Sequence, residues 1–541
     1  MAVTPPKAEE PVESPQSPVV SRPVAVSPPW VETPPPAPNV PRTYGSPPAV
    51  EIAAPPAKRR RVAVLSVVAA LVLVVIAAAG VLVVRPGPVD RWLADGPTRP
   101  PTQAPAPDPA PTPVLAAVGS SATVPTAAGV QAAIGPLIAA PILGKRVNIS
   151  VVDAATGGSL FGQNADAMIT PASTTKLLTA ATVLAARGPA YRLTTRAVAG
   201  AEPGEVVLVG GGDPTLAING KGQFPGAARL DKLADQVRKA LGDQPLKRVV
   251  VDTSLYQGPG TAAGWDSDVI GGGQVAKIQS LMTNAGRIKP VHNEVGGDPR
   301  FADPATSAAV AFTKLLVADT DPAQPLPKPG VGTAPAPPSA EPSPGVVPGI
   351  SPGTELGRVE SPPLVHVVDW MLEQSDNVIA EAMGRQVALA AGQPASFEGA
   401  AQAMIAKLNE LGLPAGAELH DASGLSRLNR ISPKLLTDVL TLAAGGKHPE
   451  LGAMFGGLPV AGWSGTLRNR FTTPAPNKVG QGLIRAKTGR LTGVNTIAGQ
   501  LVTQDGRLLL FAIMADGTGE SVGARQALDK IAARLVTCGC G

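Results

Sequence analysis

The sequence is poor in aromatic residues, histidine and cysteine, and each shortage excludes a class of protein. Phe, Trp and Tyr make up 3% of the 541 residues, and there are four histidines and two cysteines. Cys538 and Cys540 stand at the very end, so no disulfide framework holds the fold; they could pair in a small ring, bridge to another chain or stay reduced. Few histidines disfavour a Ser/His/Asp hydrolase. Because no cluster has metal-ligand spacing, we expect no metal or other cofactor.

Charge is not concentrated as it is in nucleic-acid-binding proteins. The formal net charge is +5, but the basic residues are scattered apart from Lys58–Arg61. This cluster precedes residues 62–84, which contain no charged residue. About 20 apolar residues cross a membrane as a helix, so we expect a transmembrane helix at 62–84 with its basic flank in the cytoplasm. A cleavable signal peptide is the alternative, although its apolar region is shorter and lies nearer the start of a chain.

Proline-rich segments lie on both sides of the expected membrane helix. Residues 1–57 have no apolar periodicity and are predicted to be a disordered cytoplasmic tail. Residues 86–125 are rich in Pro, Ala and Thr and are predicted to be a stiff spacer on the outer side.

The globular part is predicted to begin near Val130 and to contain an insertion. Residues 193–299 show short strand-like segments separated by glycines, which we interpret as an inserted β-rich domain. The main domain is then formed by 130–192 and 300–541, and the Pro- and Gly-rich stretch 321–352 is predicted to be an exposed loop.

The first of three short motifs is Ser173-Thr174-Thr175-Lys176. It falls at the start of a helix predicted over 170–186, with Thr170 as the N-cap. Free N–H groups and the helix dipole favour an alkoxide at Ser173, and Lys176, three residues on, shares its face. To act as a base, Lys176 must be partly neutral, which requires burial or a nearby cation. Alone, the motif more often marks a solvated first turn with an ordinary surface lysine.

The second motif, Ser375-Asp376-Asn377, separates helices predicted at 364–374 and 378–391. Residues i and i+2 do not share a helical face, so Ser375 and Asn377 reach one cleft only if the helix breaks between them. Three successive residues that compete for backbone hydrogen bonds favour such a break. A polar stretch within a continuous helix is the alternative.

The third motif, Lys487-Thr488-Gly489, lies in a strand predicted over 483–490. Strands at 494–504 and 507–514 and a helix at 522–535 follow. A strand edge can pair with an extended substrate, and Gly489 permits a close approach. Alternation along a strand points Thr488 away from Lys487, so the geometry alone gives Thr488 no place in the site. A charged edge strand that resists aggregation is the alternative.

The three motifs in this order resemble the penicillin-binding protein 4 family of D-alanyl-D-alanine carboxypeptidases and endopeptidases. Five further segments strengthen the resemblance: 209–216, 361–364, 376–381, 423–427 and 465–467. The resemblance implies an α/β (α+β) fold of the serine β-lactamase and DD-peptidase type, with a central antiparallel sheet flanked by helices.

The resemblance also implies a role for each motif residue. Ser173 would be the nucleophile, Lys176 its base and Ser375 a proton relay, while Asn377, Lys487, Thr488 and Gly489 would bind substrate. The backbone N–H groups of Ser173 and Arg490 would form the oxyanion hole. Arg490 replaces the threonine that is frequent after Lys-Thr-Gly in this family.

The expected protein is a membrane-anchored D-Ala-D-Ala carboxypeptidase in the bacterial cell envelope, and the resemblance implies DD-endopeptidase activity as a second expectation. Its expected partners are peptidoglycan stem peptides ending in D-Ala-D-Ala, β-lactam antibiotics and the membrane, but no nucleic acid. A non-catalytic peptidoglycan-binding or sensor protein and a β-lactamase are the alternatives. Class A β-lactamases place the first two motifs closer together, and we find no partner for their deacylating glutamate.

Overall fold

The computed structural model describes residues 122–291, 297–317, 328–337, 350–413 and 416–538. The predicted tail (1–57), transmembrane helix (62–84) and most of the spacer (86–125) lie outside these residues. Among the helices that are described, none has the length and apolar character needed to span a membrane. Cys538 is buried and disulfide-bonded, and Cys540 lies outside the described residues.

A five-stranded antiparallel sheet carries the third motif. Its strand order is β10-β11-β12-β1-β2. The strands are β1 (Arg146–Asp153), β2 (Ser159–Gln163), β10 (Ile484–Leu491), β11 (Val494–Val502) and β12 (Leu508–Asp516). The predicted run of three antiparallel C-terminal strands is confirmed, and the β11–β12 turn falls at Asp505-Gly506 as expected.

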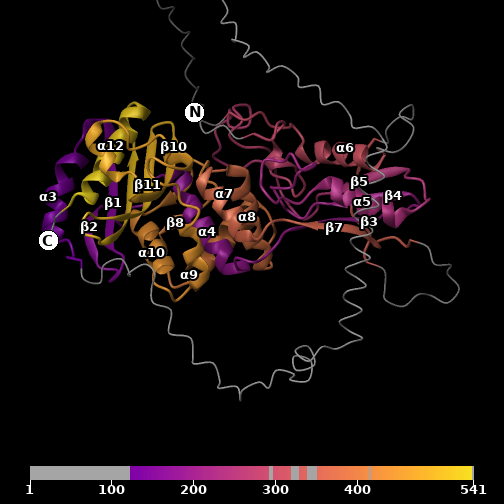
Figure 1. The fold of residues 1–541 in the computed structure, drawn as a ribbon, viewed down its shortest axis with the longest axis horizontal. Helices are drawn as coiled ribbons and strands as arrows, with labels where there is room; N and C mark the ends of the chain where they lie inside the picture. The colour runs from indigo at the N-terminus through magenta and orange to yellow at the C-terminus, as the bar shows by residue number, and fades with distance from the viewer. Residues whose placement is uncertain (1–121, 292–296, 318–327, 338–349, 414–415, 539–541) are drawn as a thin grey trace, which may run out of the picture. The chain divides into compact units, whose positions relative to one another are not determined.

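Both faces of this sheet are buried, and strand β12 shows why. Its residues alternate between two hydrophobic clusters, with Phe511 and Ile513 on one side and Ala512 and Met514 on the other. The first cluster includes residues of α3 (Ala127–Ile138) and α12 (Ser521–Val536), and the second includes residues of α4 (Thr175–Arg187) and α10 (Pro433–Ala444). Figure 1 shows the sheet between these two layers of helices.

Further helices lie on the α4 side and complete the larger cluster. They are α7 (Leu364–Glu373), α8 (Asn377–Ala390), α9 (Phe397–Glu410) and the short α11 (Pro449–Gly452). Two-residue strands β8 (Ala417–Glu418) and β9 (Arg430–Ile431) pair nearby. The predicted helices at 364–374 and 378–391 are confirmed, and so is the break between them.

A second, mixed sheet has the order β6-β5-β4-β3-β7. Its strands are β3 (Thr194–Ala199), β4 (Glu205–Val209), β5 (Arg248–Asp252), β6 (Gly330–Val331) and β7 (Glu355–Glu360). Helices α5 (Leu230–Leu241) and α6 (Pro304–Leu316) bury its apolar face. The expected boundary at 299 therefore falls inside the stretch that supplies this sheet. Part of the predicted loop 321–352 forms β6, because its backbone pairs with β5.

The start of α4 differs from the prediction. Ser173 lies in a separate 3₁₀ turn, η2 (Ala172–Thr174), and α4 begins only at Thr175. Thr170 is not the N-cap; its hydroxyl instead lies 3.5 Å from Asp516. The cause is a backbone change at Ala172, whose φ of 49° places it in the left-handed region. A periodicity argument does not detect such a change at one residue.

Asp153 and Arg507 form a buried ion pair where the neighbouring inner strands β1 and β12 end and begin. Arg507 Nε donates to Asp153 Oδ1 at 2.9 Å, and both side chains are almost wholly buried. Burial opposes ionisation of Asp153, but hydrogen bonds from Arg507 and Thr156 outweigh it, so the pKa of Asp153 is lowered. The pair therefore stabilises the fold above the ordinary aspartate pKa of about 3.9, and the contribution is lost as pH falls further.

Arg507→Met is expected to destabilise the protein by about 3 kcal/mol at pH 7, because it leaves Asp153 buried without its cation. The matched control is Arg146→Met, which breaks the Arg146–Asp516 pair on the same sheet, where the arginine side chain is 68% exposed. That change should cost less than about 1 kcal/mol. Urea denaturation of the three proteins measures both effects, and equal losses would contradict the assignment.

Candidate active site

The turn that carries Ser173 is held against β10 by close packing at two glycines. A Cβ on Gly489 would lie 2.8 Å from Ser173 N, and one on Gly424 would lie 1.9 Å from Ala172 O. Thr496 on β11 donates its hydroxyl to Pro171 O at 2.8 Å. Residues with side chains at 424 and 489 would push the turn away, so the glycines set how near Ser173 lies to the strand.

Lys176 connects the first two motifs. Its Nζ donates to Ser173 Oγ at 3.0 Å and to Asn377 Oδ1 at 2.7 Å. A third hydrogen bond, of 2.7 Å, goes to the backbone oxygen of Ser423. The lysine side chain is fully buried, so these acceptors replace its contacts with water.

The second motif occupies the predicted break between α7 and α8. Ser375 has a φ of 57°, in the left-handed region, and Asp376 caps α8 by accepting from Ile379 N at 3.0 Å. This reversal lets Ser375 and Asn377 face the same site. Asp376 also accepts from Arg287 at 2.7 Å, and Arg287 is paired with Asp298.

The third motif lies on β10 and forms the side of the site that faces Ser375. Lys487 Nζ donates to Ser375 Oγ at 2.9 Å and to the Thr488 carbonyl at 2.7 Å. The length of the lysine side chain lets Nζ reach the site although neighbouring strand residues begin on opposite faces. The Thr488 hydroxyl bonds to that of Thr466 at 3.0 Å and lines the cavity with it.

Both lysines lose basicity on burial. Burial lowers the pKa of Lys176 to about 8, although the negative charges of Asp421, Glu381 and Asp376 oppose this. Burial, and then the positive charge of Lys176, hold the pKa of Lys487 well below its ordinary value. With the site free of substrate, both amines are therefore more readily neutral than an exposed lysine.

Two buried carboxyl groups shape the loop that carries Ser423, and sequence reasoning assigned them no role. Glu381 accepts from Ser423 N at 2.9 Å, and Asp421 accepts from Gly424 N at 2.8 Å. Burial and the charge of Asp421 raise the pKa of Glu381 to about 7, against the opposing charge of Arg385. The available signal was Glu381, one turn after Asn377 in a helix whose other residues are mostly apolar.

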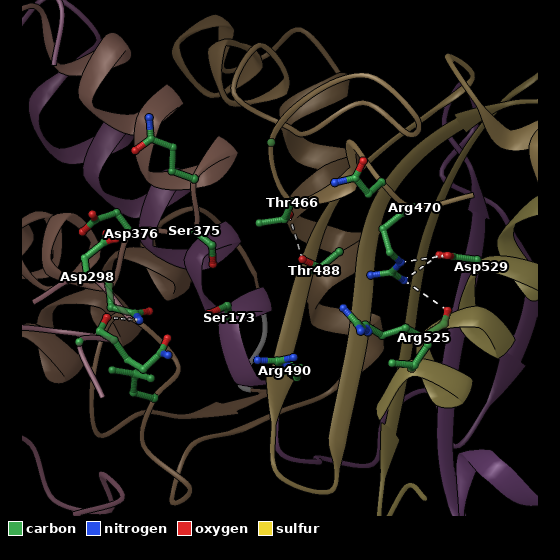
Figure 2. Close-up of a pocket in the computed structure, with 18 of the residues that line it drawn as sticks. Ser173, Asp298, Ser375, Asp376, Thr466, Arg470, Thr488, Arg490, Arg525 and Asp529 are labelled. Atoms are coloured by element: carbon green, nitrogen blue, oxygen red, sulfur yellow. Dashed lines mark hydrogen bonds and ion pairs between the residues drawn. The ribbon is translucent and has the colours of Figure 1, made fainter. Parts of the chain in front are cut away.

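A cavity of about 500 Å³ lies against the three motifs. Ser173, Ser375, Asn377, Thr488 and Arg490 line it, so the structure brings together residues from all three predicted motifs. Figure 2 shows Ser173 facing Ser375 and Thr488 across this space. Within the described ranges, no group of three or more His, Cys, Asp or Glu side chains has the arrangement of a metal site.

The arrangement has the parts needed for acyl transfer without a metal. A hydroxyl lies beside a buried amine of lowered pKa, and a second hydroxyl beside a second buried amine completes the opposite wall. An amine that is partly neutral near neutral pH can accept the proton of an attacking hydroxyl.

Comparison with known proteins gives one consistent result. The model of the D-Ala-D-Ala carboxypeptidase 3 (S13) family matches residues 130–329 and 346–535. Carboxypeptidase DacB of Mycolicibacterium smegmatis is 40% identical over 429 residues, which cover 78% of this chain and 87% of the relative. A carboxypeptidase of Mycobacterium tuberculosis is 39% identical over 450 residues, with coverages of 82% and 90%.

A solved structure agrees in fold. The crystal structure of penicillin binding protein 4 from Haemophilus influenzae has a TM-score of 0.57 and 20% identity, and the match covers 75% of this chain and 97% of that chain. The resemblance predicted from the motifs is confirmed. The chain belongs to the D-Ala-D-Ala carboxypeptidase 3 (S13) family and is a serine-type D-Ala-D-Ala carboxypeptidase.

Proposed function

We propose that Ser173 is the nucleophile of this carboxypeptidase and that the reaction passes through an ester on its Oγ. The observation that supports this most strongly is the position of Lys176, whose buried Nζ lies 3.0 Å from that oxygen. Its pKa of about 8 leaves a useful fraction of neutral amine near neutral pH.

The proposed steps conserve atoms and charge. Ser173 Oγ bonds to the carbonyl carbon of the penultimate D-alanine while its proton passes to Lys176. The carbon–nitrogen bond then breaks, and the leaving amine takes a proton relayed through Lys176 and Ser375. Water attacks the ester, which releases the shortened peptide as a carboxylate and restores the serine hydroxyl. The N–H groups of Ser173 and Arg490 would stabilise the oxyanion at both tetrahedral stages.

Substrate binding would use the remaining motif residues. Lys487 and Thr488 would receive the terminal carboxylate, which favours the charged form of Lys487 and so opposes the effect of burial on its pKa. Asn377 would hold the substrate amide. Its Nδ2 already donates to Gln274 O at 2.9 Å, so substrate must share or replace that hydrogen bond.

A β-lactam would acylate the same serine and remain bound for long. The cavity-lining carboxylates in the described part of the chain are those of Asp298, Asp376 and Asp529, and each is ion-paired with an arginine. A paired carboxylate is a poor base for activating the deacylating water. This favours a penicillin-binding carboxypeptidase over a β-lactamase.

We also propose that residues 62–84 anchor the protein in the cell membrane, so that the catalytic part acts outside on peptidoglycan stem peptides. The basic cluster Lys58–Arg61 and the uncharged stretch after it support this orientation.

Ser173→Ala is expected to abolish covalent labelling by penicillin and to reduce D-alanine release by at least about a thousandfold. Ser254→Ala is the control, because Ser254 is exposed and is not among the residues that line the cavity. Intact-mass spectrometry and a D-alanine assay give the readouts. An adduct on another serine, or normal release from the alanine variant, would refute the proposal.

The second-order rate of acylation by a β-lactam is expected to rise with pH up to about 8 and then level off, because neutral Lys176 is the base. Below that pKa the slope should approach tenfold per pH unit. Lys176→Arg should not acylate at any pH, since arginine keeps its proton, whereas Lys487→Arg should acylate measurably. A flat parental profile, or acylation by the Lys176 variant at the parental rate, would show that another group is the base.

Protease added to intact spheroplasts is expected to digest the part after residue 85 and to spare 1–57. Immunoblotting with antibodies against each end of the chain shows which part is digested and which is spared. Protection of the catalytic part would disprove the proposed orientation.

A further inference from the structure

The cavity at Ser173 continues beyond the three motifs to helix α12. Successive turns of that helix contribute Val522, Arg525, Gln526 and Asp529 to its lining. Arg470 and Arg490 line the same wall. Figure 2 shows Arg470, Arg490 and Arg525 on the Thr488 side of the cavity, across from Ser375 and Asp376.

Charges on the two walls are balanced differently. On the Ser375 side, Arg287 is paired with Asp298 and Asp376. On the α12 side, Asp529 accepts two hydrogen bonds from Arg470, of 2.9 and 2.7 Å. Neither Arg490 nor Arg525 has an ion-pair partner among the described residues, so the α12 wall carries an excess of positive charge.

The surroundings of Arg525 are unfavourable for a cation in the empty site. Burial, and then the positive charges of Arg470 and Arg490, lower its pKa, while Asp529 and Glu520 oppose the effect. The Glu520 carboxylate is occupied in capping α12, where it accepts from Val522 N at 2.7 Å and Gly523 N at 2.8 Å. An incoming anion would relieve this repulsion.

The position of these arginines fixes which part of a substrate they meet. Arg490 lies two residues beyond Thr488, so both side chains begin on the same face of β10. Thr488 is where the carboxylate next to the scissile bond would bind. Arg490 begins beside the oxyanion site that its own N–H would form, and its side chain lines the same wall as Arg525. Figure 2 shows Arg525 on the far side of Thr488 from Ser173, which is the direction in which a larger leaving group would extend.

We propose that Arg490 and Arg525 form a second carboxylate subsite for the leaving group. The chain would then prefer substrates whose released residue or peptide carries an additional carboxylate, as an acidic amino acid or a branch of a cross-linked peptide does, over those releasing a single D-alanine. This inference rests on the proposed function of Ser173. The bonds formed and broken are the same as in the reaction proposed above for D-alanine release.

The preference can be tested with three N-acylated peptides, which end in D-Ala-D-Ala, D-Ala-D-Glu and D-Ala-D-Gln. The last two have nearly the same shape and differ in one negative charge, so the ratio of their kcat/KM values reports recognition of that charge. We expect a ratio of about ten or more in the parent, from one charge-assisted hydrogen bond. The ratio should fall with added salt because the subsite is partly exposed.

Arg525→Gln should bring the ratio close to one, and Arg525→Lys should retain part of it. Arg534→Gln is the matched control, because it removes the same charge from the same helix at a position that does not line the cavity, and it should keep the parental ratio. Labelling of Ser173 by penicillin shows that each variant is folded.

The outcomes separate the two proposals. Absence of Ser173-dependent D-alanine release would overturn the proposed function itself. If D-alanine release is normal but the parent cleaves the D-Glu and D-Gln peptides with nearly equal kcat/KM, the carboxylate subsite alone is overturned, irrespective of the results for the variants. A high parental ratio that survives Arg525→Gln would also overturn it.

Discussion

The site depends on the removal of one ammonium group, that of Lys176, from water. Its Nζ meets acceptors from three separate parts of the chain: the Ser173 turn, the start of α8 at Asn377 and the loop oxygen of Ser423. Because a buried amine must be hydrogen-bonded, these acceptors cannot move apart without a large cost in free energy. Because the buried ammonium group needs these acceptors, it fixes the relative positions of the segments around Ser173.

A second buried lysine, Lys487, raises the free energy of holding charged amines in the site. The surrounding carboxyl groups partly offset this increase. Burial lowers the pKa of Lys487 most, and the positive charge of Lys176 lowers it further. Asp421, Glu381 and Asp376 supply opposing negative potential at Lys176 without contacting its Nζ. Because the carboxyl groups do not pair directly with Lys176, they raise its pKa only in part. A direct ion pair would keep the lysine charged.

Much of the fold and the site could be predicted from sequence, and the limits have identifiable causes. The strands β10–β12 and the break before Asn377 were predictable because they follow from alternation and from local competition for backbone bonds. The 3₁₀ turn at Ser173 depends on one left-handed residue, Ala172, that has no composition signal. The second sheet was harder because β7 pairs with β3 from far along the chain.

Within the site, the side chains were predictable and their backbone partners were not. The motif side chains are given directly by residue identity. The oxygens of Ser423 and Gln274 belong to the main chain, and any residue type could supply them. Segment 423–427 supported the resemblance without indicating this contact, because a carbonyl's direction depends on loop geometry, which Asp421 and Gly424 set through their hydrogen bond.

The Arg287–Asp376 ion pair has a consequence for how the protein assembles. Arg287 lies between the strands of the second sheet in sequence, and Asp376 positions Ser375 while capping α8. A chain that has formed only its main sheet would hold a buried carboxylate with no cation, so the helix start that presents Ser375 and Asn377 would be unstable. The helix start that presents Ser375 and Asn377 is thus thermodynamically coupled to the region around the second sheet, so a change that disorders Arg287 would also disorder this part of the candidate site.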